Sequence, residues 1–476
     1  MASRGRAVAA RLRARKRSPA AIRIDSLASG APPSILEELV LKRFGLEEKG
    51  VTVGSEMLAG LTTFATMAYI LFLNPVILGD AGMDRGAVLV ATALAAGIGS
   101  ILMGLIANLP FALAPGMGMN AYFTYTVVKQ MGMPWQTALA AVFLDGVIFL
   151  ILSLMPFRAK MIEDIPFNIK LAAAAAIGFF IAFIGLKNVG LVHGNPETLV
   201  EMGPVFTPAT MLTVGGLILM ATLLHRQVKG ALLWGILMVT ACGLVVPGSD
   251  GKPLVSLAQL SWPHLSALSQ GLFKLDFAGA VHLGFAKIVF TFTFVSLFDT
   301  AGTFVGLATK LGWIDHDKPT FDEAPRGLIA ESLAIMVGAL LGVSTTTTYI
   351  ESAAGIAQGG RTGLTAVVAG LCFLCSVILA PLATLIPAQA TAPVLILVGF
   401  LMMEPLLKLR LDDITEALPA FLTLIMVPLT FNIANGLIWG IVSYSLLKIA
   451  TGRAREIHAT MWILTILCLI SLQRGH

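Results

Sequence analysis

The stretch LGVSTTTTYIESAAGIAQGGRTGL, residues 341–364, lies between two long apolar runs yet is rich in groups that hydrocarbon rejects. The hydroxyl run from Ser344 to Thr348 is mostly β-branched, which favours a short extended segment over a helix. Glu351 and then small residues at helical spacing follow, which predicts a half-helix that begins near Tyr349. Such irregular backbone is tolerated at membrane depth only where it is buried in protein or lines a cavity.

Glu351 makes this stretch a candidate binding site. A charged side chain at the centre of a bilayer costs ~3 kcal/mol, so an acid placed there is a functional residue by default. The alternative is a re-entrant loop whose glutamate is structural and lies near the interface. We favour the binding site, because the hydroxyl run and the acid occur together in one interrupted segment.

The composition is that of a polytopic membrane protein. Of the 476 residues, 57% are hydrophobic and 12% are charged, and the mean hydropathy is +0.86, whereas soluble domains carry about 25% charged residues. The net charge of +5 therefore bears on topology and not on nucleic acid. Cys372 and Cys375 form a CxxC with no second pair and no nearby histidine, which favours inert buried thiols over a metal or redox site.

The first 23 residues contain eight basic residues and no acid. They lack the apolar core of a secretory signal. A transit peptide is one interpretation, but we favour a cytosolic tail or an over-long start. Residues 34–48 have helical amphipathicity, which predicts a helix on the inner membrane surface.

About fourteen apolar runs are long enough, or nearly so, to cross a bilayer. They are residues 55–78, 87–107, 109–128, 136–156, 169–186, 207–224, 230–247, 283–309, 327–342, 344–357, 362–382, 391–406, 413–429 and 433–450. The third and tenth are short and interrupted. A further run at 459–472 is too short to cross and is predicted to lie at the interface.

Basic residues mark one side of this arrangement. If the N-terminus is cytosolic, the loops after even-numbered runs should be basic. These loops contain Arg158, Lys160, Lys170, Arg226, Lys229, Lys310, Lys318, Arg326, Arg361, Lys408, Arg410, Lys448, Arg453 and Arg455, and the opposite loops only scattered bases. The pattern predicts a multi-pass protein with both termini in the cytosol, although it gives orientation and not which membrane is occupied. We expect the plasma (inner) membrane.

The third run, NLPFALAPGMGMNAYFTYTV (108–127), has the same design as the tenth. An extended piece with Pro115 passes through Gly116 to a helix with Asn120 near its start, about half a chain before Glu351. Paired broken segments at matching places in two halves indicate a transporter site at the interface of inverted repeats. Seven runs per half is odd, so the halves are expected to have opposite topology.

Asp299 lies deep in the eighth run, beside Thr300. With Glu351 it gives two intramembrane acids that are predicted to flank one cavity. Two carboxylates close together in a low dielectric would not both stay ionised, so one can carry a proton and hydrogen-bond a neutral, planar, polar ligand. Asn120 offers both a donor and an acceptor, as purine edges require. The structural alternative for Asp299 is a buried acid satisfied by hydroxyls or helix N–H groups.

Other features have simpler interpretations. Asp145 and Glu331 are further near-membrane acids, and Glu331 is equally well explained as a structural acid paired with Arg326 or Arg361. Phe111 could stack on an aromatic ligand, although membrane aromatics more often pack or face lipid. The glycine-rich residues 359–363 resemble a phosphate cradle but lack its Lys-Ser/Thr partner, so we favour a turn. The sequence contains no zinc or hydrolase motif.

Five segments together resemble one known family. They are EMLAGLTTFATMAYILFLNP (56–75), NLPFALAPGMGMNAYF (108–123), FDTAGTFVG (298–306), TTTTYIESAAGIAQGGRTGLT (345–365) and PAFLTLIMVPLTFNIANGLIWG (419–440). They resemble the adenine/guanine/hypoxanthine permeases, the azaguanine-type branch of the nucleobase–cation symporters. The resemblance is collinear and covers roughly residues 35 to 470.

The resemblance implies an all-α polytopic membrane fold of about 14 spans in two inverted repeats of seven, with short extended strands breaking spans 3 and 10. It implies core segments at 51–157 and 281–385 and gate segments at 158–250 and 386–450. The remaining divisions are the N-terminal 1–50, an extracellular loop at 251–280 and a cytosolic or interfacial tail at 451–476. The chain would be a homodimer in the lipid bilayer.

The resemblance also implies proton-coupled purine import, with the proton as the coupling ion and no cofactor, metal or enzymatic step. The substrate-binding residues would be Asn120, Asp299, Glu351, Thr300, Thr348 and Phe111, and the proton-coupling residues Asp299 and Glu351. The chain departs from the family at Ser296, where members often have an acid. The alternatives are a symporter for xanthine, urate or uracil, an anion carrier or channel of the same fold, and a membrane-embedded enzyme.

Overall fold

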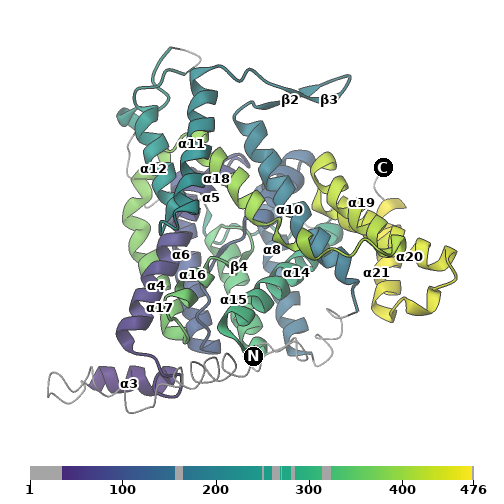
Figure 1. Ribbon diagram of the computed structural model, residues 1–476, viewed down its shortest axis with the longest axis horizontal. Coiled ribbons are helices and arrows are strands. Elements are labelled where there is room, and N and C mark those ends of the chain that lie inside the picture. The colour runs from purple at the N-terminus through teal and green to yellow at the C-terminus, as the bar shows by residue number, and fades with distance from the viewer. Residues whose placement is uncertain are drawn as a thin grey trace, which may run out of the picture.

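Apolar helices long enough to cross a membrane dominate the structure (Figure 1). The computed structural model describes residues 35–155, 164–248, 251–259, 269, 271–279, 285–313 and 323–473. Within these residues, ten helical segments have the length and composition of a membrane span. The basic leader predicted for residues 1–23 lies outside the described residues.

The helical elements fall into two halves of the chain. Those of the first half are α3 (Ile35–Phe44), α4 (Val53–Met67), α5 (Ile70–Gly79), α6 (Arg85–Leu102), η2 (Met103–Ala107), α7 (Met117–Ala121), η3 (Tyr122–Gln130), α8 (Trp135–Leu154), α10 (Phe167–Asn188), α11 (Pro208–His225), α12 (Ala231–Gly243) and η4 (Leu257–Gln259). Those of the second half are α14 (Phe285–Leu311), α15 (Ala324–Leu341), α16 (Ser352–Ala357), α17 (Gly363–Cys375), η6 (Ser376–Thr384), α18 (Ala388–Leu401), η7 (Glu404–Lys408), α19 (Ile414–Thr430), α20 (Ile433–Ala450), η8 (Ala454–Glu456) and α21 (Ala459–Gln473).

Each of the predicted apolar runs coincides with one or more of these elements. Ten runs are the long apolar segments, and two more are the shorter helices α12 and α19. The third and tenth runs are broken, as expected. The number of membrane crossings stays a prediction, since the two broken segments and the shorter helices do not reach the length of a span by themselves.

The two broken segments meet as a pair of short strands. β1 (Leu113–Pro115) and β4 (Thr346–Thr348) run antiparallel, with Leu113 opposite Thr348 and Pro115 opposite Thr346. Helices surround β4 at the centre of the molecule (Figure 1). The sequence-based prediction of short extended strands in spans 3 and 10 is therefore confirmed, and each strand leads into a short helix, α7 or α16.

Local sequence explains why the backbone leaves the helix at these points. α15 ends at Gly342, whose φ of +91° is a left-handed conformation that favours glycine. On the other strand, Pro115 has no N–H to continue a helix. Gly116 then lets the two segments approach closely, because a Cβ there would lie 2.7 Å from the Thr347 hydroxyl oxygen.

Helices from both halves pack together around the strands. α17 packs against α4 and α6, and α15 packs against α6 and α8. η2 and α17 cross at Gly104 and Gly363, where a Cβ on either glycine would lie 2.4 Å or 2.1 Å from the carbonyl oxygen of the other. Small residues at such a crossing allow two helical backbones to touch within a membrane.

We expect Gly363→Val to reduce the yield of folded protein and to lower its melting temperature. The new side chain would meet backbone rather than a flexible side chain, and overpacking of this kind costs ~1–3 kcal/mol or more. Gly215→Val on α11 is the matched control, since a Cβ there meets nothing within 4 Å. Size-exclusion profiles of heated detergent extracts measure the effect, and equal melting temperatures for the two variants would contradict this packing.

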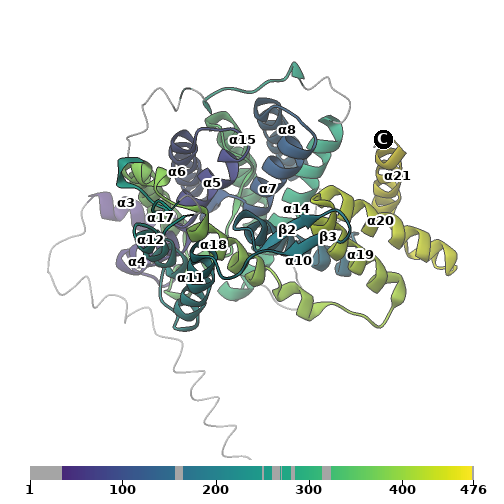
Figure 2. The ribbon, with the colours of Figure 1, turned by 90° about the horizontal axis from the view of Figure 1, so that it is seen from above.

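A second group of helices packs together through contacts of its own. α10 packs against α18 and α19, α11 packs against α12 and α18, and α19 packs against α20. In the view from above, α10, α19 and α20 extend away from α4, α6 and α17 (Figure 2). The two groups touch through smaller contacts, such as those of α12 with α4 and of α10 with α14.

Two surface elements lie at opposite ends of the molecule (Figure 1). α3 begins close to where the amphipathic helix was predicted, and the Arg43 guanidinium donates a hydrogen bond to the Leu105 carbonyl at 2.6 Å. The hairpin of β2 (Val192–Asn195) and β3 (Leu199–Met202), between α10 and α11, was not predicted. Asn195 Oδ1 closes its turn by accepting from the backbone N–H groups of Glu197 and Thr198.

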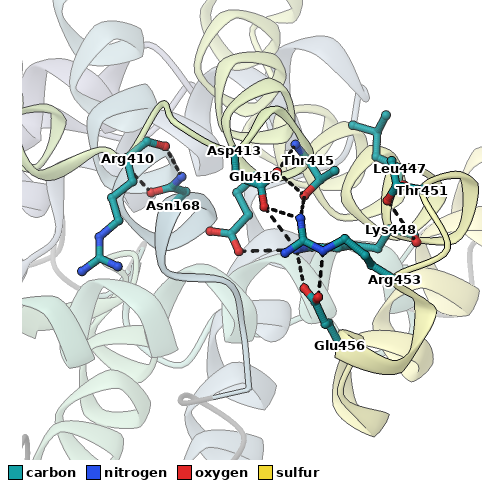
Figure 3. A network of polar contacts seen from close by, with 10 residues as sticks. All are labelled: Asn168, Arg410, Asp413, Thr415, Glu416, Leu447, Lys448, Thr451, Arg453 and Glu456. Atoms are coloured by element: carbon teal, nitrogen blue, oxygen red, sulfur yellow. Dashed lines mark hydrogen bonds and ion pairs between the residues drawn. The ribbon is translucent and has the colours of Figure 1, made fainter.

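A cluster of charges joins the ends of α19, α20 and η8 (Figure 3). The ammonium of Lys448 is buried and lies 2.8 Å from Glu456, 3.6 Å from Glu416 and 3.8 Å from Asp413. Arg453 pairs with Asp413 and Glu456 in the same network. A buried lysine remains charged at acceptable cost only when it is paired in this way.

We expect Glu456→Gln to lower the melting temperature by an amount that is constant at neutral pH and shrinks in acid. Hydrogen bonds from Arg453 and Lys448 lower the pKa of Glu456 from 4.5 to about 2. A depressed carboxyl pKa stabilises the fold above the unfolded value and loses this effect as the pH falls from 4.5 towards 2. Melting curves of both proteins across this range test it, and a difference that already disappeared near neutral pH would be the contrary result.

Candidate functional site

The backbone of the paired strands is satisfied by groups from both halves of the chain. Beyond the ladder, the Gly116 N–H donates to the Thr345 carbonyl at 2.9 Å and the Tyr349 N–H to the Ala112 carbonyl at 3.0 Å. The Leu113 N–H donates to the Ser100 hydroxyl oxygen at 2.9 Å. An unpaired backbone group in the membrane is costly, so these bonds allow extended backbone at the centre of the fold.

The hydroxyl run between Ser344 and Thr348 contacts a different polar partner at nearly every residue. Its serine hydroxyl donates to Asn120 Oδ1. The threonines at positions 345, 347 and 348 interact with Asp145, Asp299 and Glu331 respectively. One short segment therefore connects one amide and three acids that belong to separate helices.

Asp299 and Glu351, the acid that follows the hydroxyl run, differ in exposure from the other two acids beside the strands. Both residues are partly exposed, whereas Asp145 and Glu331 are fully buried. Asp299 interacts electrostatically with Glu351. The Tyr69 hydroxyl donates a hydrogen bond of 2.6 Å to Glu351 Oε1, which holds this carboxylate beside the junction of α4 and α5. The structure thus brings together the two acids that the sequence predicts at one site.

The other predicted contact residues are engaged within the protein. Asn120 is buried between the broken segments, and its Nδ2 lies 3.4 Å from the Pro115 carbonyl. Thr300 donates to Glu331 Oε1 at 2.7 Å, and Thr348 donates to Glu331 Oε2 at 3.0 Å. Phe111 is buried edge-to-face against the ring of Phe304. Direct contact of these four residues with substrate stays a prediction.

The structure corrects one expectation about Glu331. It does not pair with Arg326 or Arg361 among the described residues; instead it accepts hydrogen bonds from two threonine hydroxyls and from the Thr348 N–H at 3.1 Å. The Arg361 guanidinium donates to the Ile356 and Gly360 carbonyls. Glu331 therefore stabilises β4 by accepting hydrogen bonds from Thr348, a contact that the spacing of charges along the sequence does not reveal.

The glycine-rich turn before α17 has its N–H groups occupied. The carboxylate of Glu56 accepts from the backbone of Arg361 at 2.8 Å and of Thr362 at 3.3 Å. Asn108 Oδ1 accepts from the Gly363 N–H at 2.7 Å. Protein acceptors thus take the donors that a phosphate would need, which agrees with the interpretation of residues 359–363 as a turn.

Two further observations limit the chemistry of the described residues. No group of three or more histidine, cysteine, aspartate or glutamate side chains is placed to hold a metal ion among them. A cavity of about 50 Å³ lies against Gly82, Asp84, Trp135 and Leu341. None of the four acids beside the strands lines it; these are Asp145, Asp299, Glu331 and Glu351. Its one acid, Asp84, already caps α6 by accepting from the Ala87 N–H at 2.7 Å.

Sequence reasoning missed Tyr69 and Ser344. Tyr69 lies at the junction of α4 and α5, ahead of Pro75, which interrupts the helical hydrogen bonds of α5. A lone tyrosine ahead of a proline in an apolar run was the available signal for a polar contact at that break. Ser344 was recognised as part of the hydroxyl run, but its partner Asn120 lies in the other half of the chain.

Comparisons with known proteins find a matching family model and several relatives. A family model described as "Permease family" matches residues 54–438. Adenine permease AdeP of Escherichia coli (strain K12) is 41% identical over 90% of this chain and 95% of the relative. Guanine/hypoxanthine permease PbuG of Bacillus subtilis (strain 168) is 41% identical over 88% of this chain and 96% of the relative.

Solved transporter structures share the fold. The transmembrane domain of the cyanobacterial bicarbonate transporter BicA superimposes with a TM-score of 0.58 at 16% identity, covering 81% of this chain and 97% of that one. SLC26A9 gives a TM-score of 0.56 at 10% identity, covering 87% of this chain and 69% of that one. At these identities the likeness concerns the inverted-repeat fold alone.

Proposed function

This chain belongs to the permease family, and we propose that it is a secondary active transporter that imports the purine nucleobases adenine, guanine or hypoxanthine across the plasma membrane. The family makes it a multi-pass membrane transporter and not an enzyme. The observation that carries the proposal is the pair of partly exposed acids, Asp299 and Glu351, beside the paired strands.

The chemistry of these acids suits a neutral heterocycle. A purine edge presents N–H donors beside ring nitrogen acceptors, and an ionised carboxylate accepts from the donors while a protonated one can also donate. Tyr69 fixes the orientation of Glu351, so this carboxylate is held in place before the ligand arrives. Asn120 on the opposite half-helix, α7, accepts a hydrogen bond from Ser344 just ahead of β4, and this bond ties α7 to β4.

Proton coupling follows from the same pair. Asp299 and Glu351 repel each other when both are ionised, and removal from water makes that repulsion stronger. One of them therefore takes up a proton, which also removes a net charge before the site crosses the membrane field. We propose that base and proton enter together from outside and leave together inside.

We further propose that movement of two helix groups provides alternating access. The core would consist of α4 to α8 and α14 to α17, and the gate of α10 to α12 and α18 to α20. Extensive packing within each group and smaller contacts between them support this division. Asp299 and Glu351 both belong to the core, so the acids would move with the bound base. A homodimer is proposed from the family resemblance, and cross-linking in membranes tests it.

Uptake assays in a cell that lacks its own purine transporters test the proposed function. Expression of the chain should cause accumulation of chemically unchanged radiolabelled adenine, guanine or hypoxanthine, and a protonophore at fixed voltage should reduce the initial rate. Competition by unlabelled xanthine, urate and uracil separates the related symporters. No uptake of any purine by correctly inserted protein would reject the proposal.

An anion carrier would use the same fold but different site chemistry. Anion sites rely on arginine, lysine or the positive ends of helices. Here the partly exposed charged residues beside the strands are the acids Asp299 and Glu351, and their carboxylates would repel a bound anion. Uptake of labelled bicarbonate or sulfate in place of purine would reverse this conclusion.

A further inference from the structure

Asp145 on α8 is a buried acid that the proposed site does not use. It is fully buried, and its Oδ2 accepts from the Ser296 hydroxyl at 2.9 Å and from the Thr345 hydroxyl at 3.4 Å. Its Oδ1 makes no hydrogen bond among the described residues, and the Thr293 hydroxyl on α14 interacts with the same carboxyl. No described lysine or arginine side chain forms an ion pair with it.

The described charged groups around α8 have partners or positions away from Asp145; Asp276, for example, accepts from Thr137 near the start of this helix. The helix packs against α14, α15 and η3. Two acids on these elements have other partners: Asp299 interacts with Thr347, and Glu331 accepts from Thr300 and Thr348. The ring of Tyr122 packs on Phe292. Tyr125 donates to Asp80, and Lys129 lies over the Tyr125 ring. Lys310 and Arg326 lie at the end of α14 and the start of α15. The contacts of Asp145 itself are therefore neutral hydroxyls.

An ionised carboxylate in this position would carry a large desolvation cost with no cation to offset it. The neutral acid avoids that cost: Oδ2 continues to accept from the two hydroxyls, and Oδ1 carries the proton. The geometry points to Asp145 as a second proton-binding residue, whose proton is coupled to transport. This inference rests on the proposed function, because it adds a proton site to the proposed symporter.

Asp145 is connected to the proposed site through the two hydroxyls that donate to its Oδ2. Ser296 lies one turn before Asp299 on the same face of α14. Thr345 belongs to the same run as Thr347 and therefore follows any movement of β4. A base that shifts α14 or β4 would lengthen a bond to Asp145 and change how tightly this residue holds its proton.

The contact with Ser296 makes a direct test possible. The Ser296 hydroxyl on α14 lies against the Asp145 carboxyl on α8. The pair Asp145–Ser296 thus places one carboxyl and one hydroxyl in contact across the two helices. Exchanging the two residues should preserve the pair, which provides a rescue experiment that a purely structural role for Asp145 does not predict.

The test combines transport with a direct measure of protonation. In Asp145→Asn, uptake at neutral pH should fall about tenfold, within the range typical of coupling between two sites, and its dependence on pH should flatten. Exchange of preloaded base should persist. Asp145→Ser combined with Ser296→Asp should restore the pH dependence, and Asp84→Asn, at an exposed helix cap, is the matched carboxylate-to-amide control.

Infrared spectra of the purified full-length protein provide the second readout. The wild type at neutral pH should show the C=O band of a protonated carboxyl that is missing in Asp145→Asn. A folded Asp145→Asn protein with the wild-type pH profile would overturn the inference, and so would an unchanged band. If wild-type protein transported no purine, the proposed function would fail, and the band alone would then decide whether Asp145 binds a proton.

Discussion

Glu351→Gln should abolish accumulation of purine by a protein that still folds and reaches the membrane. Glutamine has the size of glutamate and keeps an oxygen that can accept the hydrogen bond from Tyr69. It cannot ionise, however, and it cannot take up or release a proton. Loss of hydrogen bonds to a charged group costs ~1.5–3 kcal/mol each, which is about a 10- to 100-fold loss of affinity, and the loss of coupling removes the driving force as well.

Two further variants separate this explanation from simple damage. Tyr69→Phe removes only the donor that orients Glu351, so uptake should fall but remain measurable. Glu38→Gln changes an exposed glutamate on α3 whose only described partner is Lys42, so uptake should be unaffected. The measurement is the initial rate of radiolabelled purine uptake at matched surface expression. Accumulation of base at the normal rate by Glu351→Gln would remove this residue from the site.

The layout of the fold could be predicted from local signals in the sequence. Long apolar runs report membrane helices because the bilayer sets their length. The two breaks were visible because Pro115 and the β-branched hydroxyl run disfavour helix at membrane depth. The two breaks lie at matching places in the two halves, which indicated inverted repeats. Pairing of β1 with β4 is the structural result of that symmetry.

The partners of the buried polar groups could not be predicted in the same way. Asn120 and Ser344 meet across the two halves of the chain, and Asp145 meets Ser296 across a helix contact. Such pairs depend on the rotation of each helix about its axis, which apolar runs without a strong polar face leave undefined. The β2–β3 hairpin and the burial of Lys448 were missed for a related reason, because both depend on contacts outside the apolar runs.

The wrong expectation for Glu331 shows how charge alone misleads. Nearby arginines in the sequence suggested an ion pair. Arg326, however, lies exposed at the start of α15, whereas Glu331 lies buried in the middle of the same helix. Three neutral donors around β4 satisfy the carboxylate instead. Of the acids beside the strands, Glu331 therefore accepts the most hydrogen bonds. We expect its removal to lower the free energy of unfolding.

Glu331→Leu should prevent stable folding, whereas Glu331→Gln should not. Leucine leaves the Thr348 N–H and the hydroxyls of Thr300 and Thr348 without their acceptor. Each unsatisfied buried group costs ~1–3 kcal/mol, and a loss of several kcal/mol is a large part of the ~5–15 kcal/mol that stabilises a typical protein. Glutamine keeps Oε1 as the acceptor for Thr300 and for the Thr348 N–H, and its amide can donate to the Thr348 hydroxyl oxygen.

Melting temperature and uptake measured on the same preparations decide between two roles of this residue. A positioning role predicts that Glu331→Gln melts close to wild type and retains most of its uptake, while Glu331→Leu yields little folded protein. A well-folded Glu331→Gln protein without uptake would instead require the carboxyl group itself, as a proton carrier beside Asp299. A Glu331→Leu protein that melted like wild type would mean that the three donors find other acceptors, and that β4 does not depend on Glu331 for its support.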